Sequence, residues 1–410
     1  MTSDPVFVWT WLPGDGAPVV AGRIDRLPTG PVVFTYGRSY LERDGAIALY
    51  EPELPLVDGP ARAANGDGVP LCVADSGPDA WGRRVINYRA GIDSSVDLDD
   101  LSYLVASGGG IGALAFTASS SDPPSGSDNA ATLDELSQAS LLVEQGAPLP
   151  DTLAKALLHG TSVGGARPKA WLSDGDRHLI AKFSSGSDDF PFVQSEFVAM
   201  TLAAHAGLDV AAVEYREVMG RHALLVDRFD RVHGSRRRMV SALTMLGLDA
   251  FLSGRYATYF DLADVIRHRF DNPDATLREL FSRIVFNVLC SNTDDHGKNH
   301  AAFWDGRTLT LTPGYDISPQ RRSGETARQA MAYAPIAPGT DGNDSRVADV
   351  IAAASIYHLD RSEAGSIVDA QATTMRERWD EVCDQARLGS VDRARLWGRQ
   401  FCNPAAFYRS

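Results

Sequence analysis

A short polar segment carries residue types that can hold a metal ion and accept a proton. It covers residues 291–299 and contains Asp294, Asp295, His296 and Asn299. Carboxylate and amide oxygens suit Mg²⁺, which proteins bind through a few carboxylates together with substrate phosphates. The four residues between Asp294 and Asn299 also match the catalytic loop of protein kinases, where Asp accepts the hydroxyl proton and Asn binds metal. A solvated helix end followed by turn residues would have a similar composition.

The residues after this segment predict a tight hairpin. Two apolar stretches flank the dipeptide Asp305-Gly306, which favours a two-residue type I′ turn. That register places Asn299 opposite Thr312 and folds the following loop back beside it. Since this loop carries Asp316, we expect Asp294, Asn299 and Asp316 to converge on one magnesium site.

A second predicted hairpin offers a place for phosphate groups. Residues 161–169 lead into a strand, the chain turns near Asp174-Gly175, and the return strand carries Lys182. Depending on the turn length, Lys182 lies opposite Arg167 or Lys169. Adjacent glycines before the first strand allow the backbone to approach an anion closely. A Gly-rich hairpin that binds no ligand fits the same residues.

The elements that position these segments follow from apolar periodicity. Helical spacing over 277–289 predicts a helix that ends at the polar segment, with Asp274 able to cap its first turn. Similar patterns predict helices over 133–144 and 193–204. Short apolar runs predict a β-rich start with strands at 6–8, 19–20 and 32–35, two strand pairs between 167 and 240, and a buried strand at 223–226.

These elements predict an α/β (α+β) fold in several parts. A length of 410 residues agrees, because single cores stop growing beyond roughly 250–300 residues. A stretch rich in Ser, Asp and Pro cannot bury apolar surface and is the best linker candidate. The predicted parts are a β-rich subdomain at 1–117, a linker at 118–132, a small lobe with the phosphate hairpin at 133–240 and a helical lobe at 241–410.

Composition excludes several classes of function. A net charge of -14 disfavours a direct grip on DNA, because such binding depends on neutralising phosphates with Lys and Arg. The four cysteines contain no C-x-x-C pair, which argues against a disulfide framework and a zinc site. No apolar run reaches the ~18 residues of a membrane span, so we expect a cytoplasmic protein without a membrane partner. The basic cluster at 231–238 is expected to form a hairpin tip rather than a nucleic-acid surface.

The order of motifs along the chain resembles the HipA toxin kinases, bacterial serine/threonine protein kinases of toxin-antitoxin modules linked to persistence. The segments that carry the resemblance are 34–36, 75–82 and 110–113 in the first third, and 162–169, 226–231, 292–299 and 315–316 in the rest. The resemblance implies a two-lobed protein-kinase-like fold with an N-terminal accessory subdomain and a mostly helical C-terminal lobe. It also implies an ATP- and Mg²⁺-dependent kinase that is neutralised by a HipB-like helix-turn-helix antitoxin.

The resemblance implies a role for each matching residue. Asp294 would be the catalytic base, Lys182 would contact the ATP phosphates, and Asn299 and Asp316 would bind Mg²⁺. Ser162 would be autophosphorylated, and its added charge would repel the phosphate loop from the nucleotide. The other nucleotide contacts would be Gly164, Gly165, Ala166, Arg167 and Lys169 in the phosphate loop, Asp227 and Phe229 at the hinge, and His296 and Tyr315 beside the nucleotide.

Two departures from the best-known member leave questions open. Asp295 follows the predicted base where that member has Gly, so a second carboxylate leaves the number of metal ions open. Residues 240–248 also differ near the hinge, so that the family's well-known target, glutamyl-tRNA synthetase, does not transfer directly. One alternative is a kinase for a sugar or antibiotic hydroxyl. Another is a catalytically weak partner of a DNA-binding antitoxin, with only indirect contact to DNA.

Overall fold

The computed structural model describes residues 4–64, 66–92, 96–124, 131–150, 153, 157, 167–232, 234–249, 256–322, 324–337 and 341–408. Its contacts divide the chain into two compact units, each made of several segments. The first unit comprises Met1–Ser185, Glu217–Asp249 and Ala302–Thr308. The second comprises Gly186–Arg216, Ala250–Ala301 and Leu309–Ser410. The domain boundaries predicted at residues 117, 132 and 240 follow chain order and stay a prediction.

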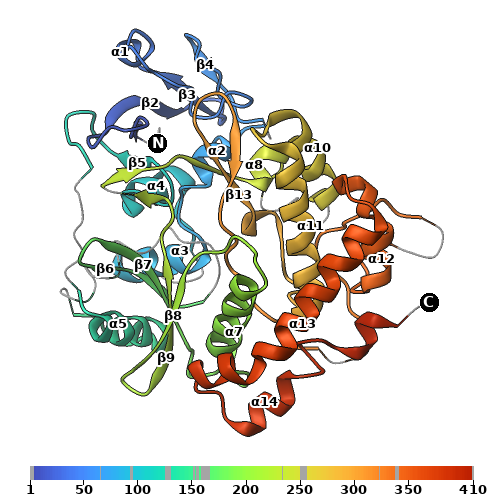
Figure 1. Cartoon of the computed structure of the whole chain (residues 1–410). Helices are drawn as coiled ribbons and strands as arrows, with labels where there is room; N and C mark the ends of the chain where they lie inside the picture. Colours follow the sequence, from blue (N-terminus) through green and yellow to red (C-terminus); the bar gives the residue numbers. More distant parts are fainter. Residues whose placement is uncertain are drawn as a thin grey trace. The chain divides into compact units, whose positions relative to one another are not determined.

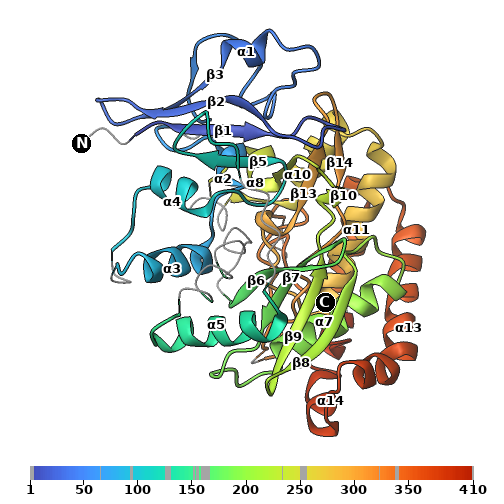
Figure 2. The same cartoon turned by 90° about the vertical axis from the view of Figure 1, so that its left-hand side faces the viewer.

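The first unit begins with a five-stranded sheet of order β4-β3-β2-β1-β5. Strand β1 pairs antiparallel with both β2 and β5, and β2 pairs antiparallel with β3 (Figure 2). The strands are rich in Val and Phe, which fit a half-buried pleated surface. Their bounds are Val6–Thr10 (β1), Val19–Arg26 (β2), Val32–Tyr36 (β3), Pro60–Ala61 (β4) and Leu114–Thr117 (β5). Helices α1, Arg38–Leu41, α2, Leu71–Ala74, and α4, Asp100–Ser107, lie between these strands along the chain.

A second sheet has the order β6-β7-β9-β8, with bounds Lys169–Asp174, Arg177–Phe183, Arg221–Asp227 and Val213–Val218 respectively. Helices α3, Ala80–Arg89, and α5, Leu133–Gln145, share one hydrophobic core with this sheet (Figure 2). Trp81 from α3, Leu136 from α5 and Phe183 from β7 are all buried in this core. Thr132 and Glu135 form a capping box that fixes the start of α5. The sheet that carries Lys169 and Lys182 is therefore backed by a packed core.

The basic cluster at 231–238 forms a hairpin, as predicted. Strand β10, Arg231–Val232, pairs with β11, Ser235–Arg236, and the chain continues into β12, Met239–Ser241, and α8, Ala242–Leu246. The guanidinium of Arg236 lies 3.6 Å from the ring centre of Trp11, and that of Arg237 lies 3.2 Å from that of Phe303. These arginines are held against aromatic rings instead of forming an open basic surface.

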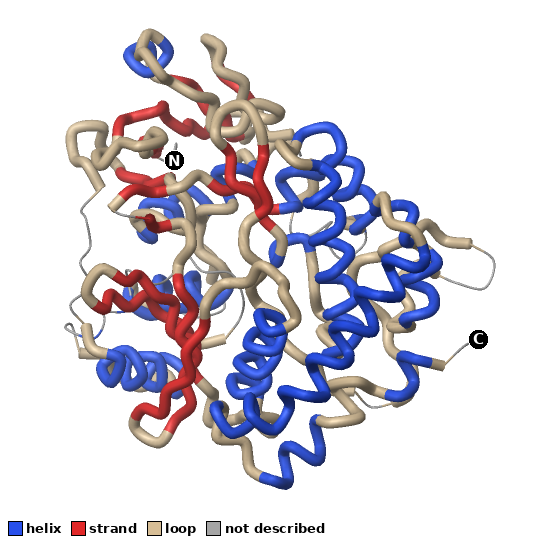
Figure 3. Tube along the Cα trace, viewed as in Figure 1, coloured by secondary structure: helices blue, strands red, loops and turns tan. Residues whose placement is uncertain are grey.

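The second unit is mostly helical (Figures 1 and 3). Its long helices α10, α11 and α13 pack on one another in sequence order, and α7 packs on α13. The bounds of its helices are Phe192–His205 (α7), Tyr259–Arg269 (α10), Pro273–Cys290 (α11), Val347–Ala352 (α12), Arg361–Gln385 (α13) and Ser390–Leu396 (α14), with short 3₁₀ turns at Gly297–Asn299, Ala354–Tyr357 and Pro404–Phe407. The chain between α11 and α12 contains β13, Ala301–Trp304, and β14, Leu309–Leu311, which extend β12 into a sheet of order β12-β13-β14.

Most predicted elements are confirmed. Helices α5, α7 and α11 match the helical patterns, and β1, β2, β3 and the pairs β6/β7 and β8/β9 match the predicted strands. The predicted cap of α11 is wrong. Asn272 occupies the N-cap without a side-chain bond and Pro273 opens the helix, while Asp274 bonds Nδ1 of His358 at 2.8 Å. In the described part of the chain, no helix is both long and apolar enough to cross a membrane.

Candidate active site

The segment that carries Asp294 begins at a capped helix end. Helix α11 stops at Cys290 because Ser291 adopts a left-handed conformation with φ of 54°. The backbone N–H of Asn292 then donates to the carbonyl of Asn287 at 2.9 Å, which satisfies one of the last carbonyls of the helix. The hydroxyl of Ser291 donates to the carbonyl of Gln400 at 2.8 Å. The buried helix therefore fixes where the polar segment starts.

The two neighbouring aspartates of this segment have opposite environments. Asp294 is exposed, and within the described residues its carboxylate has no hydrogen-bond or ion-pair partner. Asp295 is buried, and one of its oxygens accepts from Nδ2 of Asn287 at 2.8 Å, Nε2 of His300 at 2.7 Å and the hydroxyl of Tyr259. The sequence left open whether this second carboxylate adds a metal ligand; in the structure, one of its oxygens accepts three hydrogen bonds and so anchors the loop to α10 and α11.

The anchor is held in its charged form. Burial alone would raise the pKa of Asp295, but His300 and the hydrogen bonds from His300 and Tyr259 outweigh it and lower this pKa below its usual value. Burial and the Asp295 charge raise the pKa of Tyr259 well above its usual value. A charged carboxylate that accepts three hydrogen bonds therefore holds the backbone directly after Asp294.

The predicted neighbours Asn299 and Asp316 lie on segments that the structure brings together. The hydroxyl of Tyr315 donates to the carbonyl of Lys298 at 2.7 Å, so the two segments are in contact. Asn299 is buried in the 3₁₀ turn, yet its side chain has no hydrogen-bond partner in the described part of the chain. Asp316 has φ of 59°, a left-handed conformation that is sparsely populated outside Gly, Asn and Asp and concentrates at functional sites.

The hairpin register that led to this expectation is wrong by two residues. The N–H of Thr312 donates to the carbonyl of Ala301 at 3.0 Å, so Ala301 and not Asn299 pairs with Thr312. The turn centres on Gly306 and the next residue because the Asp305 carboxylate accepts the N–H groups of Arg307 and Thr308 at 2.7 and 2.8 Å. A side chain that caps its own turn overrode the dipeptide preference.

The loop before Asp316 is held in place by α11. Arg283, buried on that helix, donates to the carbonyls of Asp209 and Thr312 at 2.9 Å each, while its Nε pairs with Glu279 at 2.7 Å. Gly314 passes so close that an added Cβ would lie 3.3 Å from a Val210 methyl carbon and 3.5 Å from the Arg283 guanidinium. A side chain here would require a small shift of Val210, whereas the distance to Arg283 is an ordinary contact.

The donor set fits a magnesium ion that is shared with phosphates. No group of three or more His, Cys, Asp and Glu side chains that could hold a metal occurs in the described residues. Mg²⁺ is commonly bound by one or two carboxylates, waters and substrate phosphates. A further observation favours a ligand here: Nδ1 of His296 is buried without a hydrogen-bond partner in the described residues.

The phosphate hairpin lies in the first unit, and its register settles one alternative. Asp174 pairs with Arg177, which places Lys182 opposite Lys169 and not Arg167. Lys169 is buried and its ammonium pairs with Asp79 at 2.7 Å, whereas Lys182 is only half buried. Asp79 also accepts the N–H of Gly82 at the start of α3. Lys169 thus ties the hairpin to α3, and Lys182 is the more accessible of the two cations.

The predicted hinge residues lie where β9 ends. Asp227 pairs with Arg177 of β7 at 2.7 Å, and the ring of Phe229 meets that of Phe303 edge-on. Between them and β10, the buried Asp230 accepts from Arg228 and Arg231 at 2.7 Å each. Burial opposes this charge, but the two arginines outweigh burial and lower the pKa of Asp230 strongly. The predicted hinge residues are therefore followed by a buried ionic cluster.

Four of the predicted nucleotide-site residues lie outside the described residues, namely Ser162, Gly164, Gly165 and Ala166. Arg167, the next in the predicted loop, is described and half buried.

Sequence reasoning missed the anchoring role of three buried carboxylates, two in the first unit and one in the second. Asp79 anchors the phosphate hairpin, Asp230 the end of β9 and Asp295 the catalytic segment. Each occurs within a motif that carried the resemblance. The sequence does not distinguish an exposed Asp from a buried one. The role of each Asp becomes clear only from the hydrogen-bond donors that surround it in the structure.

Comparison with known proteins agrees with this architecture. The model of the HipA-like C-terminal domain matches residues 161–387, and that of the HipA N-terminal domain matches residues 17–117. A chain of the Shewanella oneidensis toxin-antitoxin complex of HipA, HipB and operator DNA has the same fold. It superposes with a TM-score of 0.69 at 20% identity, over 99% of this chain and all of that one.

Curated relatives are named as kinases. A putative kinase, Y4mE, from Sinorhizobium fredii is 32% identical over 34% of this chain and 33% of its own length. The serine/threonine-protein kinase toxin HipA of Shewanella oneidensis is 31% identical over 30% of this chain and 33% of its own. A putative kinase of Haemophilus influenzae is 24% identical over 45% and 60% respectively. The chain thus spans about a third of the length of the first two relatives.

The predicted α/β fold, with a β-rich N-terminal subdomain and a mostly helical C-terminal part, is confirmed at the level of the fold. The C-terminal family model alone matches more than half of the residues. By these matches and by its fold, the chain belongs to the HipA family.

Proposed function

We propose that this protein is an ATP- and Mg²⁺-dependent kinase that phosphorylates a serine or threonine hydroxyl of a protein. The observation that carries the proposal is the pairing of an exposed, unpartnered Asp294 with a buried, donor-saturated Asp295, in the part of the chain that the structure describes. A general base must be accessible to its substrate and also held rigidly. Neighbouring residues meet these two demands here.

The chemistry assigned to the chain is mainly positioning. Asp294 would accept the proton of the substrate hydroxyl as that oxygen attacks the γ-phosphorus of ATP and ADP leaves. Asn299 and Asp316 would hold Mg²⁺, which when bound supplies charge neutralisation at the phosphates. The contact between Tyr315 and the carbonyl of Lys298 supports this assignment, because it joins the segments of both ligands. His296, with its unpartnered ring nitrogen, would hydrogen-bond the nucleotide side of the site.

The first unit would contribute the nucleotide contacts. Lys182 would bind the ATP phosphates, while Lys169 would position the hairpin through Asp79 instead of contacting the nucleotide. Asp227 and Phe229 would line the adenine side. The phosphate loop, Gly164 to Arg167, would surround the phosphates, and Ser162 would be the autophosphorylation site that shuts the kinase off.

The proposed biological setting is that of a toxin-antitoxin module. A HipB-like antitoxin would be the partner, and DNA would be contacted through that partner, because a net charge of -14 opposes direct binding. The protein target would be of the aminoacyl-tRNA synthetase class, as in the family's known case. Its use of ATP implies a cytoplasmic setting.

The test incubates dephosphorylated wild type, Asp294→Asn, Asp316→Asn and Ser162→Ala with Mg²⁺ and ATP, followed by intact mass and peptide mapping. We expect one added phosphate on Ser162 in wild type. The two active-site variants should show at least a hundredfold lower rate, as expected when a general base or a metal ligand is removed. Asp369→Asn, an exposed carboxylate on α13, is the matched control and should behave like wild type.

The proposal fails if wild type gains no phosphate and calorimetry detects no ATP binding. A partner-binding protein without catalysis would then be the better account. Phosphate that appears equally in wild type and in Asp294→Asn would instead remove Asp294 from the role of base.

A further inference from the structure

A pocket rich in arginine lies in the second unit, close to the start of the catalytic segment. It has a volume of about 460 Å³ and is lined by Phe190, Arg321, Arg322, Arg395, Arg399 and Gln400. None of these described lining residues is acidic. Four guanidinium groups around one small cavity are unexpected in a chain with a net charge of -14. No role proposed above uses this pocket.

Two of the arginines are matched by nearby carboxylates. Arg321 forms an ion pair with Asp189, and Arg395 lies 3.9 Å from Asp392, with both pairs largely exposed. Exposed pairs of this kind contribute little energy and can exchange partners at small cost. They reduce the local charge without filling the cavity, because neither Asp lines it.

The other two arginines are not neutralised. In the described residues Arg399 has no side-chain partner. Arg322 donates to the Ser291 hydroxyl at 3.3 Å and to the carbonyl of Glu325, both neutral acceptors, while its Nε is buried without a partner. Burial also lowers the pKa of Arg322 from its usual value. Two positive charges therefore remain at the pocket. A phosphate dianion would balance a charge of this size.

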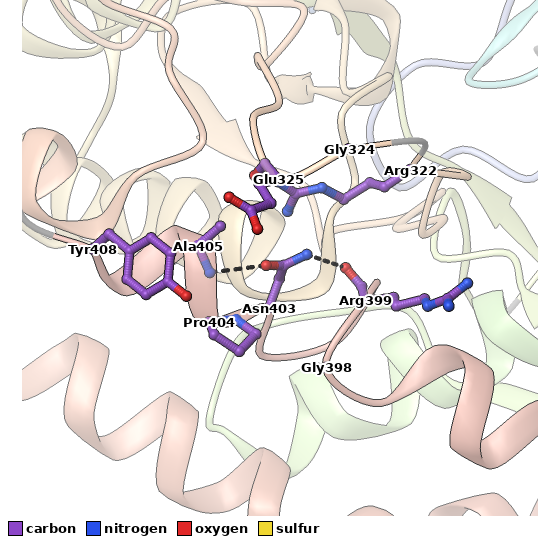
Figure 4. A pocket seen from close by; sticks show the side chains of 9 residues that line it. All are labelled: Arg322, Gly324, Glu325, Gly398, Arg399, Asn403, Pro404, Ala405 and Tyr408. Atoms are coloured by element: carbon purple, nitrogen blue, oxygen red, sulfur yellow. Dashed lines mark hydrogen bonds between the residues drawn. The ribbon is translucent and has the colours of Figure 1, made fainter.

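An adjoining pocket of about 420 Å³ shares Arg322 and Arg399 with the first (Figure 4). Glu325, Asn403 and Tyr408 also line it. The carboxylate of Glu325 makes this neighbour unfavourable for an anion, since like charges repel at short range. The first pocket, with its four arginines, is thus the favoured place for a negative group. The adjoining pocket can take the neutral chain that carries this group.

The pocket is connected to the catalytic segment through one residue. Ser291 caps α11 and receives a hydrogen bond from Arg322, while its hydroxyl donates to the carbonyl of Gln400. Its own carbonyl accepts the N–H of Gln320, which precedes Arg321. Two lining arginines therefore follow Asp316 closely in the chain, and the pocket wall bonds to the residue where the Asp294 segment begins.

We propose that this arginine pocket binds a phosphate group carried on a polypeptide. Clustered arginines recognise phosphate through bidentate, charge-assisted bonds, which a single carboxylate satisfies less completely. A small, partly open cavity of this size accepts one such group, whereas nucleic acid requires an extended basic surface. That the polypeptide is a kinase substrate or the modified chain itself rests on the proposed function, but the binding step does not.

The test measures fluorescence anisotropy of a short neutral peptide that carries one phosphoserine, with matched peptides carrying Ser or Glu and a single-stranded oligonucleotide. An excess of a non-hydrolysable ATP analogue occupies the nucleotide site. The full chain is compared with Arg399→Gln, the double variant Arg395→Gln/Arg399→Gln and the control Arg378→Gln. These three arginines are exposed, so folding is checked only by circular dichroism. Inorganic phosphate serves as competitor.

We expect the phosphoserine peptide to bind at least tenfold more tightly than the Ser and Glu peptides. Arg399→Gln should lose about tenfold in affinity, the double variant more, and Arg378→Gln nothing. Inorganic phosphate should compete with the peptide.

Equal binding of the phosphoserine and Ser peptides, or unchanged binding by the double variant, overturns the proposal. Equal binding of the Glu peptide assigns the pocket to carboxylates, and tighter oligonucleotide binding through the same arginines assigns it to nucleic acid; both also overturn it. Since no turnover is measured, a chain that fails to bind ATP still gives a clear result for the pocket.

Discussion

In each of the two units, an accessible candidate residue lies next to a buried anchoring residue, but the geometry that separates the two differs. In the second unit, adjacent residues take the two roles, with Asp294 exposed and Asp295 buried among donors. In the first unit the roles fall to cross-strand partners, since Lys169 is buried against Asp79 and Lys182 opposite it is half buried. In a turn, neighbouring side chains can point into different environments, one exposed and one buried. Cross-strand partners share one face of the sheet, so a third residue must decide which of the two is the anchor. Asp79 is that residue.

The largest expected effect separates the two aspartates. Asp294→Asn should lower the phosphorylation rate roughly 10²- to 10⁴-fold through loss of general-base help, with stability changed by less than about 0.5 kcal/mol because the site is exposed. Asp295→Ala should lower the free energy of unfolding by about 3–5 kcal/mol, since it breaks a buried ionic network. Urea denaturation and rate measurement on both variants test the division. Equal destabilisation by both substitutions would remove it.

The two lysines should separate in the same way. Lys169→Met deprives the buried Asp79 of its ion-pair partner, so we expect a loss of about 3–5 kcal/mol in stability. Lys182→Met should cost about 1 kcal/mol or less but weaken ATP binding. Calorimetric titration with ATP and urea denaturation provide the two readouts. If Lys182→Met proves the more destabilising variant, the assignment of anchor and ligand must be exchanged.

Acid should weaken the anchor of the catalytic segment. The pKa of Asp295 in the folded protein lies below its value of about 3.9 in unfolded chains. As the pH falls, the unfolded state therefore takes up this proton first, and the stabilisation present above about pH 5 is lost progressively through the folded pKa. Urea midpoints measured between pH 6 and pH 3 should decline less steeply for Asp295→Asn than for wild type. Parallel declines would contradict the anchor.

The smallest expected loss of stability concerns the turn at Gly306, where the observed hairpin register differs from the predicted one. Asp305→Ala removes two side-chain bonds to exposed backbone N–H groups, so we expect a loss of about 1 kcal/mol. Thermal denaturation measures it, and Thr308→Ala, which removes only a 3.3 Å bond to the same carboxylate, is the matched control. A larger loss in the control would show that the Asp305 cap does not hold the turn.

Local patterns predicted the elements well because they depend on short-range preferences. The apolar periodicity of 277–289 identifies α11, and the turn at Gly175 fixes the register of β6 and β7 once its length is known. The hairpin at Gly306 failed at the same level, because the Asp305 carboxylate competed with the preference of Asp-Gly for the turn centre. The positions of the site residues 162–166 remain outside the described residues, so their roles stay a prediction.

The sequence by itself determined which residues can do the chemistry and in what order they occur, because residue type and spacing are local properties. It could not distinguish Asp294 from Asp295, nor Lys169 from Lys182. Those distinctions come from Tyr259, Asn287 and His300 around one carboxylate and from Asp79 beside one ammonium. Only the tertiary structure decided them, since the cost of burying a charge depends on donors and counterions that folding brings together, including Tyr259 and Asp79, which lie far from their partners along the chain.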